Sequence, residues 1–396
     1  MQTRLSKLFA RFGPGVLVTA AFVGPGTIAT ASSAGANFGF VLLWALLFSI
    51  MATLVLQEMA ARLGLVTRAG LAEAMRSSFH SRWLGRLSVI LVVAAVGLGN
   101  AAYEAGNIAG AALALATISD IGTGTWALLI GIGAGLLLAS GRYRLLESVL
   151  IVLVLLMSGV FLVTAILVAP PLGAVLAGLA IPSLPQGSML TVIALIGTTV
   201  VPYNLFLHAN AVREKWSADV PVARALRESR WDTGLSIGLG GLITLAIVST
   251  AAAAFFQSGT EFSGQSLGLQ LEPLLGPSAR YVFAAGLFAS GLTSAITAPL
   301  AAAYAVCGAM GWSARLDARP FRLVWAAVLL TGTLFAALGT RPLAAILFAQ
   351  VANGFLLPFV AVFLLLVMNR RSLLGDQING PLANLLGSLV VLIAFG

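Results

Sequence analysis

Residues 14–34 read PGVLVTAAFVGPGTIATASSA, an apolar run that can cross a bilayer and that carries the stretch 24–27 (GPGT) at its middle. A second apolar run, residues 187–208, carries the stretch 201–204 (VPYN). Proline removes a backbone donor and glycine loosens the backbone, so both helices are expected to unwind there. A lone proline commonly makes only a kink. Two breaks in corresponding positions of two halves instead indicate a central binding site, because unpaired backbone groups are tolerated in lipid only where they line a cavity.

The composition indicates a polytopic helical membrane protein. Of the 396 residues, 59% are hydrophobic and 9% are charged, whereas a soluble domain carries about 25% charged residues. The single cysteine, Cys307, excludes a disulfide scaffold and a cysteine-based zinc site. The sequence has no Walker motif, no glycine-rich nucleotide loop before a helix and no HExxH motif, which favours secondary transport or a channel over a pump. No nucleophile is paired with a base, so we expect neither an enzyme nor a cofactor.

Hydropathy predicts an all-α protein with about eleven membrane-spanning helices in a single transmembrane domain, residues 1–396. The first ten spans form two sets of five that begin with opposite orientation, as an inverted repeat requires. The first repeat covers residues 14–168, the second covers residues 187–368, and an extra helix follows at 379–395. The predicted spans are 14–34, 39–60, 86–117, 124–140, 145–168, 187–208, 230–256, 279–311, 321–339, 343–368 and 379–395.

The basic residues alternate sharply between the two sides of the membrane. The formal net charge is +9, and 20 of the 22 lysines and arginines fall in loops on one side, which leaves Arg280 and Arg341 on the other. Because positive loops stay in the cytoplasm, we expect an inner-membrane protein with its N-terminus inside and its C-terminus outside. The basic charge then reflects topology and contact with anionic lipid rather than nucleic acid.

Three segments carry a resemblance to the NRAMP family of divalent-metal transporters, along essentially the whole chain. Residues 13–64 resemble the first two helices of that family, whose Asp-Pro-Gly-Asn break reads GPGT at 24–27 here. Residues 196–212 resemble its sixth helix, whose Met-Pro-His-Asn signature reads VPYN at 201–204. Residues 347–375 are similar to its tenth helix. The resemblance implies a LeuT-type fold with a 5+5 inverted repeat in which helices 1 and 6 are unwound at mid-membrane.

The residues that hold metal in this family are mostly replaced here. The resemblance places Gly24 at the metal-binding Asp, Thr27 at the Asn, Val201 at the Met and Thr198 at the residue whose carbonyl binds metal. Only Gln350 is retained. A neutral cradle in a low-dielectric cavity leaves a divalent cation uncompensated, so no metal-ligating set is expected at these positions.

Two helix N-termini that face a cavity without an acid attract anions. We therefore predict a proton-coupled transporter of a small organic solute that bears a carboxylate or similar polar head. Two alternatives remain: a transporter of divalent Mg²⁺ or Mn²⁺ of the NRAMP type, and a channel or non-transporting member. The polar side chains can also serve only as hydrogen-bonding contacts between helices. The predicted substrate-binding residues are Gly24, Gly26, Thr27, Thr198, Val201, Tyr203, Asn204, Gln350 and Asn353.

One acid, Glu104, lies about halfway along a span, and an acid at this depth is a functional candidate. The resemblance places Glu104 at a third-helix Asp on the proton route of the family, and Asn107 at a Glu. His208, near the cytoplasmic end of the sixth span, is a titratable group that can join a proton relay. We predict a proton-coupling set of Glu104, Asn107 and His208, with structural hydrogen bonding or direct cation binding as alternatives. We expect protons, a small-molecule or ion substrate and the lipid bilayer as partners, and a monomer.

Overall fold

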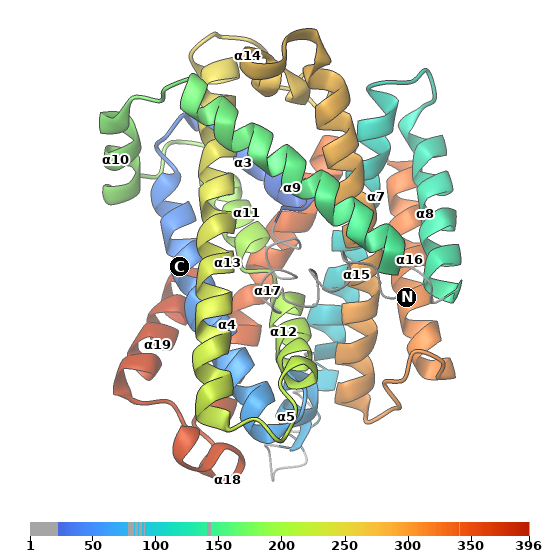
Figure 1. Ribbon diagram of the computed structural model, residues 1–396, viewed down its shortest axis with the longest axis vertical. Helices are drawn as coiled ribbons and strands as arrows, with labels where there is room; N and C mark the ends of the chain where they lie inside the picture. The colour runs from blue at the N-terminus through green and yellow to red at the C-terminus, as the bar shows by residue number, and fades with distance from the viewer. Residues whose placement is uncertain are drawn as a thin grey trace.

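Long apolar helices run from one end of the molecule to the other, and α9 (Arg144–Leu167) crosses them obliquely (Figure 1). The computed structural model describes residues 23–77, 83, 86, 89–90, 92–140, 144–339 and 341–395. Helices are the only regular elements in these ranges. The remaining α-helices are α3 (Pro25–Phe38), α4 (Leu43–Thr67), α5 (Leu71–Ser77), α7 (Gly99–Ala116), α8 (Thr123–Ser140), α10 (Leu172–Ala180), α11 (Met189–Thr199), α12 (Pro202–Lys215), α13 (Val222–Ala251), α14 (Glu272–Leu275), α15 (Ala279–Met310), α16 (Arg319–Leu338), α17 (Pro342–Met368), α18 (Arg371–Leu374) and α19 (Pro381–Phe395). The shorter 3₁₀ and π segments are η1 (Val93–Leu98), η2 (Ala252–Phe256), η3 (Leu267–Leu271), η4 (Gly276–Ser278) and η5 (Gly375–Gln377).

The predicted spans match the helices closely where the chain is described. Eight helical segments of the described ranges are long and apolar enough to cross a bilayer. The largest difference is at α13, which begins at Val222 rather than near residue 230 because its polar first turns are also helical, with Arg224 and Glu228 paired at 2.8 Å one turn apart. The nine-residue α10 was not predicted and is too short to cross a membrane. Residues 14–22 of the first predicted span lie outside the described residues.

The predicted break in the sixth span is confirmed. Helix α11 ends at Thr199 and α12 begins at Pro202, and between them Val200 and Val201 leave the helical conformation (φ −100°, ψ 70° and φ −72°, ψ 120°). Pro202 occupies the first turn, where its missing N–H would be unpaired in any case. The break therefore starts a new helix inside the molecule rather than bending a continuous one.

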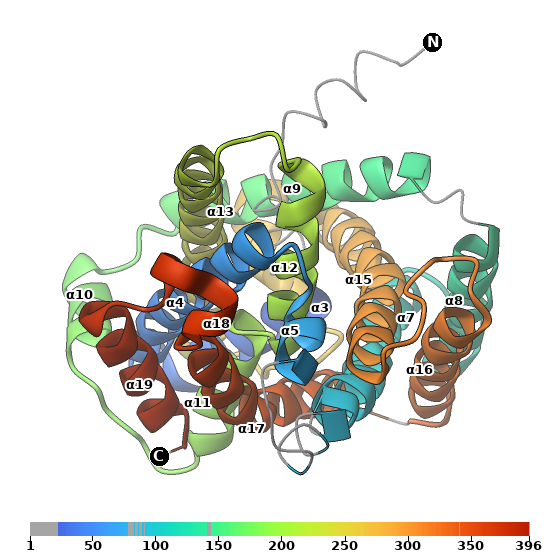
Figure 2. The ribbon, with the colours of Figure 1, turned by 90° about the horizontal axis from the view of Figure 1, so that it is seen from below.

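Small residues let the central helices approach each other closely. Gly291 of α15 lies against α7, because a Cβ at that position would come within 2.8 Å of the Asn107 carbonyl oxygen. Gly106 and Gly110 of α7 lie in the same way against α17 and against Pro25 of α3. Seen from below, α3 lies near the centre of the bundle, behind α12 and α5 (Figure 2). Close backbone approach is the usual basis of helix association in membranes.

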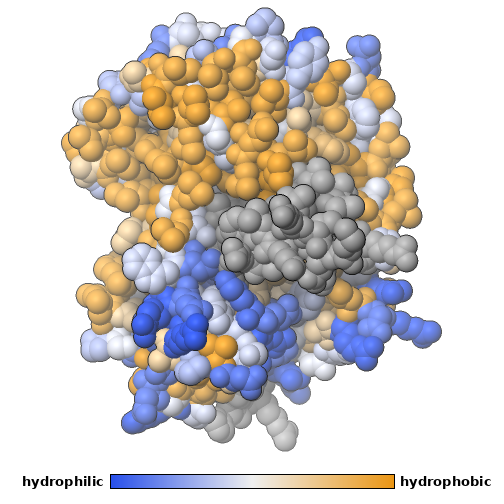
Figure 3. Space-filling model, viewed as in Figure 1, coloured by the Kyte–Doolittle hydropathy of each residue, from blue (hydrophilic) through white to orange (hydrophobic). Residues whose placement is uncertain are grey.

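The outer surface is that of a membrane protein. Hydrophobic residues cover most of the upper part of the face seen in Figure 3, and hydrophilic residues gather at its lower edge, where α5, α12 and α18 lie in Figure 1. Large side chains such as Leu338 (82% exposed) and Ile166 (76% exposed) point outward from the bundle. A soluble monomer rarely exposes such a continuous apolar surface, so these side chains face lipid.

Candidate functional site

The site is organised by the starts of α3 and α12, each of which has a proline in its first turn and no acidic residue there. Before α3, Gly24 is extended (φ −81°, ψ 173°). The hydroxyl of Thr27, in the first turn of α3, lies 2.9 Å from the hydroxyl of Thr198 near the end of α11. This hydrogen bond brings the two sequence-predicted breaks together. Both helices direct the positive ends of their dipoles at the same region.

Gln350 of α17 lies against both broken helices. A Cβ at Gly26 would overlap the Gln350 side-chain amide, and a Cβ at Gly197 of α11 would overlap the Gln350 carbonyl oxygen and the Gly354 backbone nitrogen. The glycines at these two positions are therefore what allow α17 to approach α3 and α11. The Gln350 Nε2 donates a long hydrogen bond (3.4 Å) to the Ile346 carbonyl oxygen. The predicted neighbours Gly26, Thr27, Thr198 and Gln350 form one cluster.

Unpartnered buried polar atoms concentrate on the predicted residues. Among the described residues, eleven buried side-chain nitrogen or oxygen atoms have no hydrogen-bond partner, and seven of them belong to predicted site residues. Buried polar groups are normally satisfied, so each exception calls for an explanation. A polar guest or its water shell would supply the missing partners. The seven atoms are Glu104 Oε1, Tyr203 OH, Asn204 Nδ2, Asn204 Oδ1, His208 Nδ1, Gln350 Oε1 and Asn353 Nδ2.

The remaining predicted substrate residues differ in what they contribute. Val201 precedes α12 and packs in a hydrophobic cluster, so only its backbone is polar at the break. Asn353 follows Gln350 by one turn on α17 and is likewise buried. The Tyr203 ring packs on Tyr103 of α7, with centroids 5.3 Å apart and planes at 59°. Tyr103 was missed from the sequence; its position next to Glu104 in a helix of small residues was the available signal.

Glu104 and Asn107 meet, but on a different side of α7. The Asn107 Nδ2 donates to Glu104 Oε2 at 3.2 Å, and the Glu104 stem packs on Gly332 of α16. Gly106 and Gly110, which face α17 and α3, lie on the opposite side of the same helix. Glu104 is fully buried, and its stem contacts α16, whereas Gly26 of α3 contacts the Gln350 amide of α17. No hydrogen bond joins the Glu104 carboxyl to Gln350 among the described residues.

His208 lies one turn after Asn204 on α12 and is buried. Its Nε2 lies 3.3 Å from the Thr233 hydroxyl of α13, while Nδ1 has no partner among the described residues. The ring therefore links the middle of α12 to α13. The structure gives no direct contact between His208 and the Glu104–Asn107 pair.

The side chains of the cluster that could bind a metal ion are neutral. No group of three or more His, Cys, Asp or Glu side chains in the described ranges is placed to hold a metal ion. The side chains present offer hydroxyls and amides, whose oxygens are ligands for hard cations that keep part of their water. Position 201 is a valine, whose side chain offers no thioether for softer ions.

Replacing Gly26 with alanine tests the contact with Gln350. Because the new Cβ would overlap only the end of a flexible side chain, we expect a folded protein in which the amide is displaced and substrate binding is weakened several-fold. Isothermal titration of the substrate into the protein measures the change in affinity, and thermal unfolding verifies that the fold is retained. Gly133→Ala is the control, because no atom lies within 4 Å of a Cβ there. Unchanged binding in Gly26→Ala would remove Gln350 from the site.

Comparison with known proteins identifies the relatives of this fold. A family profile described as natural resistance-associated macrophage protein-like (Nramp) matches residues 15–396. The divalent metal cation transporter MntH of Bradyrhizobium diazoefficiens is 32% identical over 400 residues, which cover 95% of this chain and 85% of that protein. The manganese transporter of Eremococcus coleocola, crystallised with an aromatic bis-isothiourea substituted compound, superposes with a TM-score of 0.77 at 26% identity and covers 100% of this chain and 86% of that chain. MhsT, crystallised with L-phenylalanine, is similar in fold alone (TM-score 0.65, 17% identity, 100% and 98% covered).

These comparisons confirm the LeuT-type fold and bear on the expected substrate. The relatives are named as transporters and not as enzymes. The predicted change to an organic solute finds no support among them, and the divalent-cation alternative fits them better. The organic-solute prediction depended on the absence of an acidic side chain at positions 24, 27, 198 and 201.

Proposed function

Because the chain belongs to the Nramp family, we propose that it is a proton-coupled transporter of a divalent metal cation that stays partly hydrated, Mg²⁺ or Mn²⁺. The observation that carries the proposal is the pair of buried, unpartnered amide oxygens beside the two helix breaks, Gln350 Oε1 and Asn204 Oδ1. Oxygen donors suit hard cations, and Mg²⁺ in particular keeps several waters. The bound waters spread the charge of the ion over the neutral side chains of the cluster and form hydrogen bonds with them.

Each part of the cradle has a role in this proposal. The Thr27 and Thr198 hydroxyls accept from the bound waters or bind the ion directly, and they hold the first helix break to the second. Gln350 and Asn204 supply amide oxygens, and Asn353 supplies a donor to the water shell. The backbone carbonyls that end α11 add partial negative charge. Tyr203 closes the side toward α7 through its contact with Tyr103.

The proton is carried by an acid on the face of α7 that contacts α16, apart from the face that contacts α17 and α3. Glu104 is the acid, Asn107 orients it through the 3.2 Å hydrogen bond, and His208 accepts or releases the proton on the cytoplasmic side. Separation of the proton carrier from the cation site lets the two charges be bound without direct competition. The same proposal includes a monomer in the inner membrane with a cytoplasmic N-terminus and an external C-terminus, divided into repeats 14–168 and 187–368 followed by 379–395.

Titration of the purified protein with Mn²⁺, Mg²⁺ and Ca²⁺ tests the proposal. We expect saturable binding of Mn²⁺ or Mg²⁺ that weakens about tenfold in Gln350→Ala and in Thr27→Ala, equivalent to about 1.4 kcal/mol for each. The matched controls are Asn100→Ala, a buried amide bonded to the Ala298 carbonyl oxygen, and Thr244→Ala, a buried hydroxyl bonded within its own helix. Absence of binding for all three cations, or equal losses in the controls, would contradict the cation site.

A further inference from the structure

The first turns of α13 extend beyond the membrane core. The apolar span that contains α13 runs over 35 residues, Val222–Phe256, whereas a bilayer core needs about 20 residues. The part from Leu235 to Phe256 already has that length. Arg227 and Arg230 therefore lie one to two turns before the hydrocarbon begins, at the depth of the lipid headgroups.

A hollow lies on the outer side of this part of α13. Its volume is about 630 Å³. Gly234 is one of its lining residues, and a Cβ there would have no atom within 4 Å. The residues that line it are Ala223, Arg227, Arg230, Trp231, Gly234 and Leu235. A headgroup and the start of an acyl chain have room in it.

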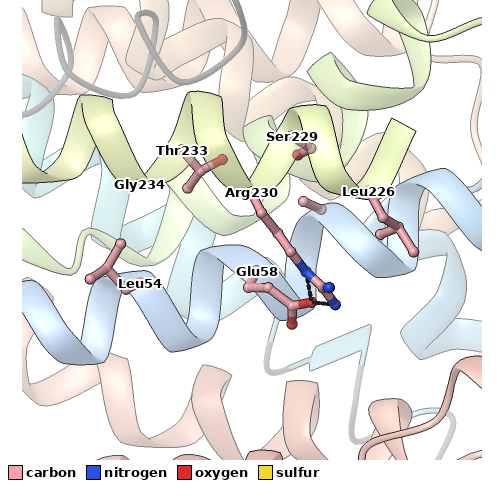
Figure 4. Close-up of a pocket in the computed structure, with 8 residues that line it drawn as sticks. Leu54, Glu58, Leu226, Ser229, Arg230, Thr233 and Gly234 are labelled. Carbon is pink, nitrogen blue, oxygen red and sulfur yellow. Dashed lines mark hydrogen bonds and ion pairs between the residues drawn. The ribbon is translucent and has the colours of Figure 1, made fainter. Parts of the chain in front are cut away.

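The arginines at this surface outnumber the nearby acids by one. Arg230 reaches across to Glu58 of α4 at 2.7 Å (Figure 4), and Glu58 also binds Arg62 at 3.1 Å. Glu58 is thus shared between two arginines. Arg227 forms no ion pair with any residue in the described part of the chain. The first turns of α13 also hold Arg224, Glu228 and Asp232, and Arg224 pairs with Glu228. Together with Arg62 and Glu58 of α4, the four arginines and three acids of this surface leave a net charge of +1.

An exposed apolar stripe continues from the hollow along the membrane. Trp231, Leu235, Leu239 and Leu242 are 69%, 68%, 44% and 52% exposed. Their spacing of four, four and three residues places them on one face of α13. Tryptophan is enriched at the level of the headgroups, and the leucines beyond it lie at the level of the acyl chains.

We propose that this surface is a binding site for an anionic phospholipid. The headgroup phosphate lies between Arg227 and Arg230, the glycerol backbone lies over Gly234, and one acyl chain follows Leu235, Leu239 and Leu242. A net negative headgroup is favoured over a zwitterionic one because the choline of the latter would add positive charge next to Arg227, which has no ion pair in the described part of the chain. Since Arg230 also holds Glu58, the bound lipid lies next to the contact between α13 and α4.

Native mass spectrometry of the full-length protein with added phosphatidylglycerol or phosphatidylcholine tests the site. We expect preferential phosphatidylglycerol binding that weakens about fivefold in Arg227→Gln and is lost in Gly234→Leu, which fills the hollow. Arg322→Gln and Gly133→Leu are the matched controls, a basic residue at the start of α16 and an open glycine of α8, and neither should change binding.

Three results would overturn the proposal. The first is equal binding of the two lipids by the unaltered protein. The second is an equal loss of phosphatidylglycerol in the control variants, which would indicate general surface charge. The third is displacement of phosphatidylglycerol by inorganic phosphate at millimolar concentration, which would indicate a free anion as the occupant. Thermal unfolding of each variant verifies that the fold is retained.

Discussion

Replacing Glu104 with glutamine is expected to abolish proton movement while leaving cation binding intact. The carboxyl is fully buried, bonded to Asn107 at 3.2 Å and packed on Gly332, and glutamine keeps its shape and hydrogen bond but carries no ionisable proton. Because the side chain faces α16 rather than Gln350, its loss should leave the cation site unchanged. In proteoliposomes, cation-driven acidification should fall to the level of protein-free vesicles, and titration should give the same cation affinity as the unaltered protein.

The control for this experiment is Glu272→Gln, which removes an exposed acid in the first turn of α14. It should acidify vesicles like the unaltered protein. Unchanged acidification in Glu104→Gln would exclude Glu104 from the proton route. Loss of cation binding together with acidification would instead make Glu104 a ligand of the cation and contradict a separate proton route.

Introducing a carboxylate at position 24 is expected to strengthen Mn²⁺ binding at least tenfold, or about 1.4 kcal/mol. The backbone of Gly24 is extended (φ −81°, ψ 173°), a conformation that aspartate adopts readily at the start of a helix. A negative charge there would face the positive ends of α3 and α12 and would offer an oxygen ligand to the ion. Titration of Gly24→Asp with Mn²⁺ measures the gain.

Gly24→Asn is the matched control, because asparagine has nearly the same size and also caps a helix but adds no charge. Its Mn²⁺ affinity should stay within about twofold of the unaltered protein. If Gly24→Asp bound Mn²⁺ no better than Gly24→Asn, position 24 would lie outside the cation site. Its assignment to the position of the metal-binding Asp of the family would then be wrong.

Much of the fold was predictable because lipid imposes strict conditions on a chain. A span needs about 20 apolar residues and internal pairing of its backbone groups, so length and hydropathy located helices such as α15 and α17 within a few residues. The break before Pro202 was predictable because a second interruption, at Gly24–Thr27, lies in the corresponding span of the other half. Proline alone was not sufficient, since Pro299 and Pro358 lie inside the continuous helices α15 and α17. The polar first turns of α13 were not, because hydropathy does not register a helix that continues beyond the membrane.

The candidate site was predicted by residue but not by arrangement. Sequence comparison placed Thr27, Thr198 and Gln350 in one site, and the structure brings them together. Nothing in the sequence indicated that Gln350 occupies the space above Gly26, or that Tyr103 packs on Tyr203. These contacts join residues far apart along the chain, and they depend on how closely glycine lets particular helices approach.

The sequence by itself determined that this protein spans the membrane, that its sixth span is broken beside Pro202 and that position 24 carries no carboxylate. The first two follow from what lipid requires of a chain, and the third from the residue type alone. The tertiary structure decided which side chains share a cavity. It placed the Glu104 stem against α16 and the Gln350 amide against α3. Which partner a helical side chain contacts depends on where the neighbouring helices lie, and the sequence does not give their positions.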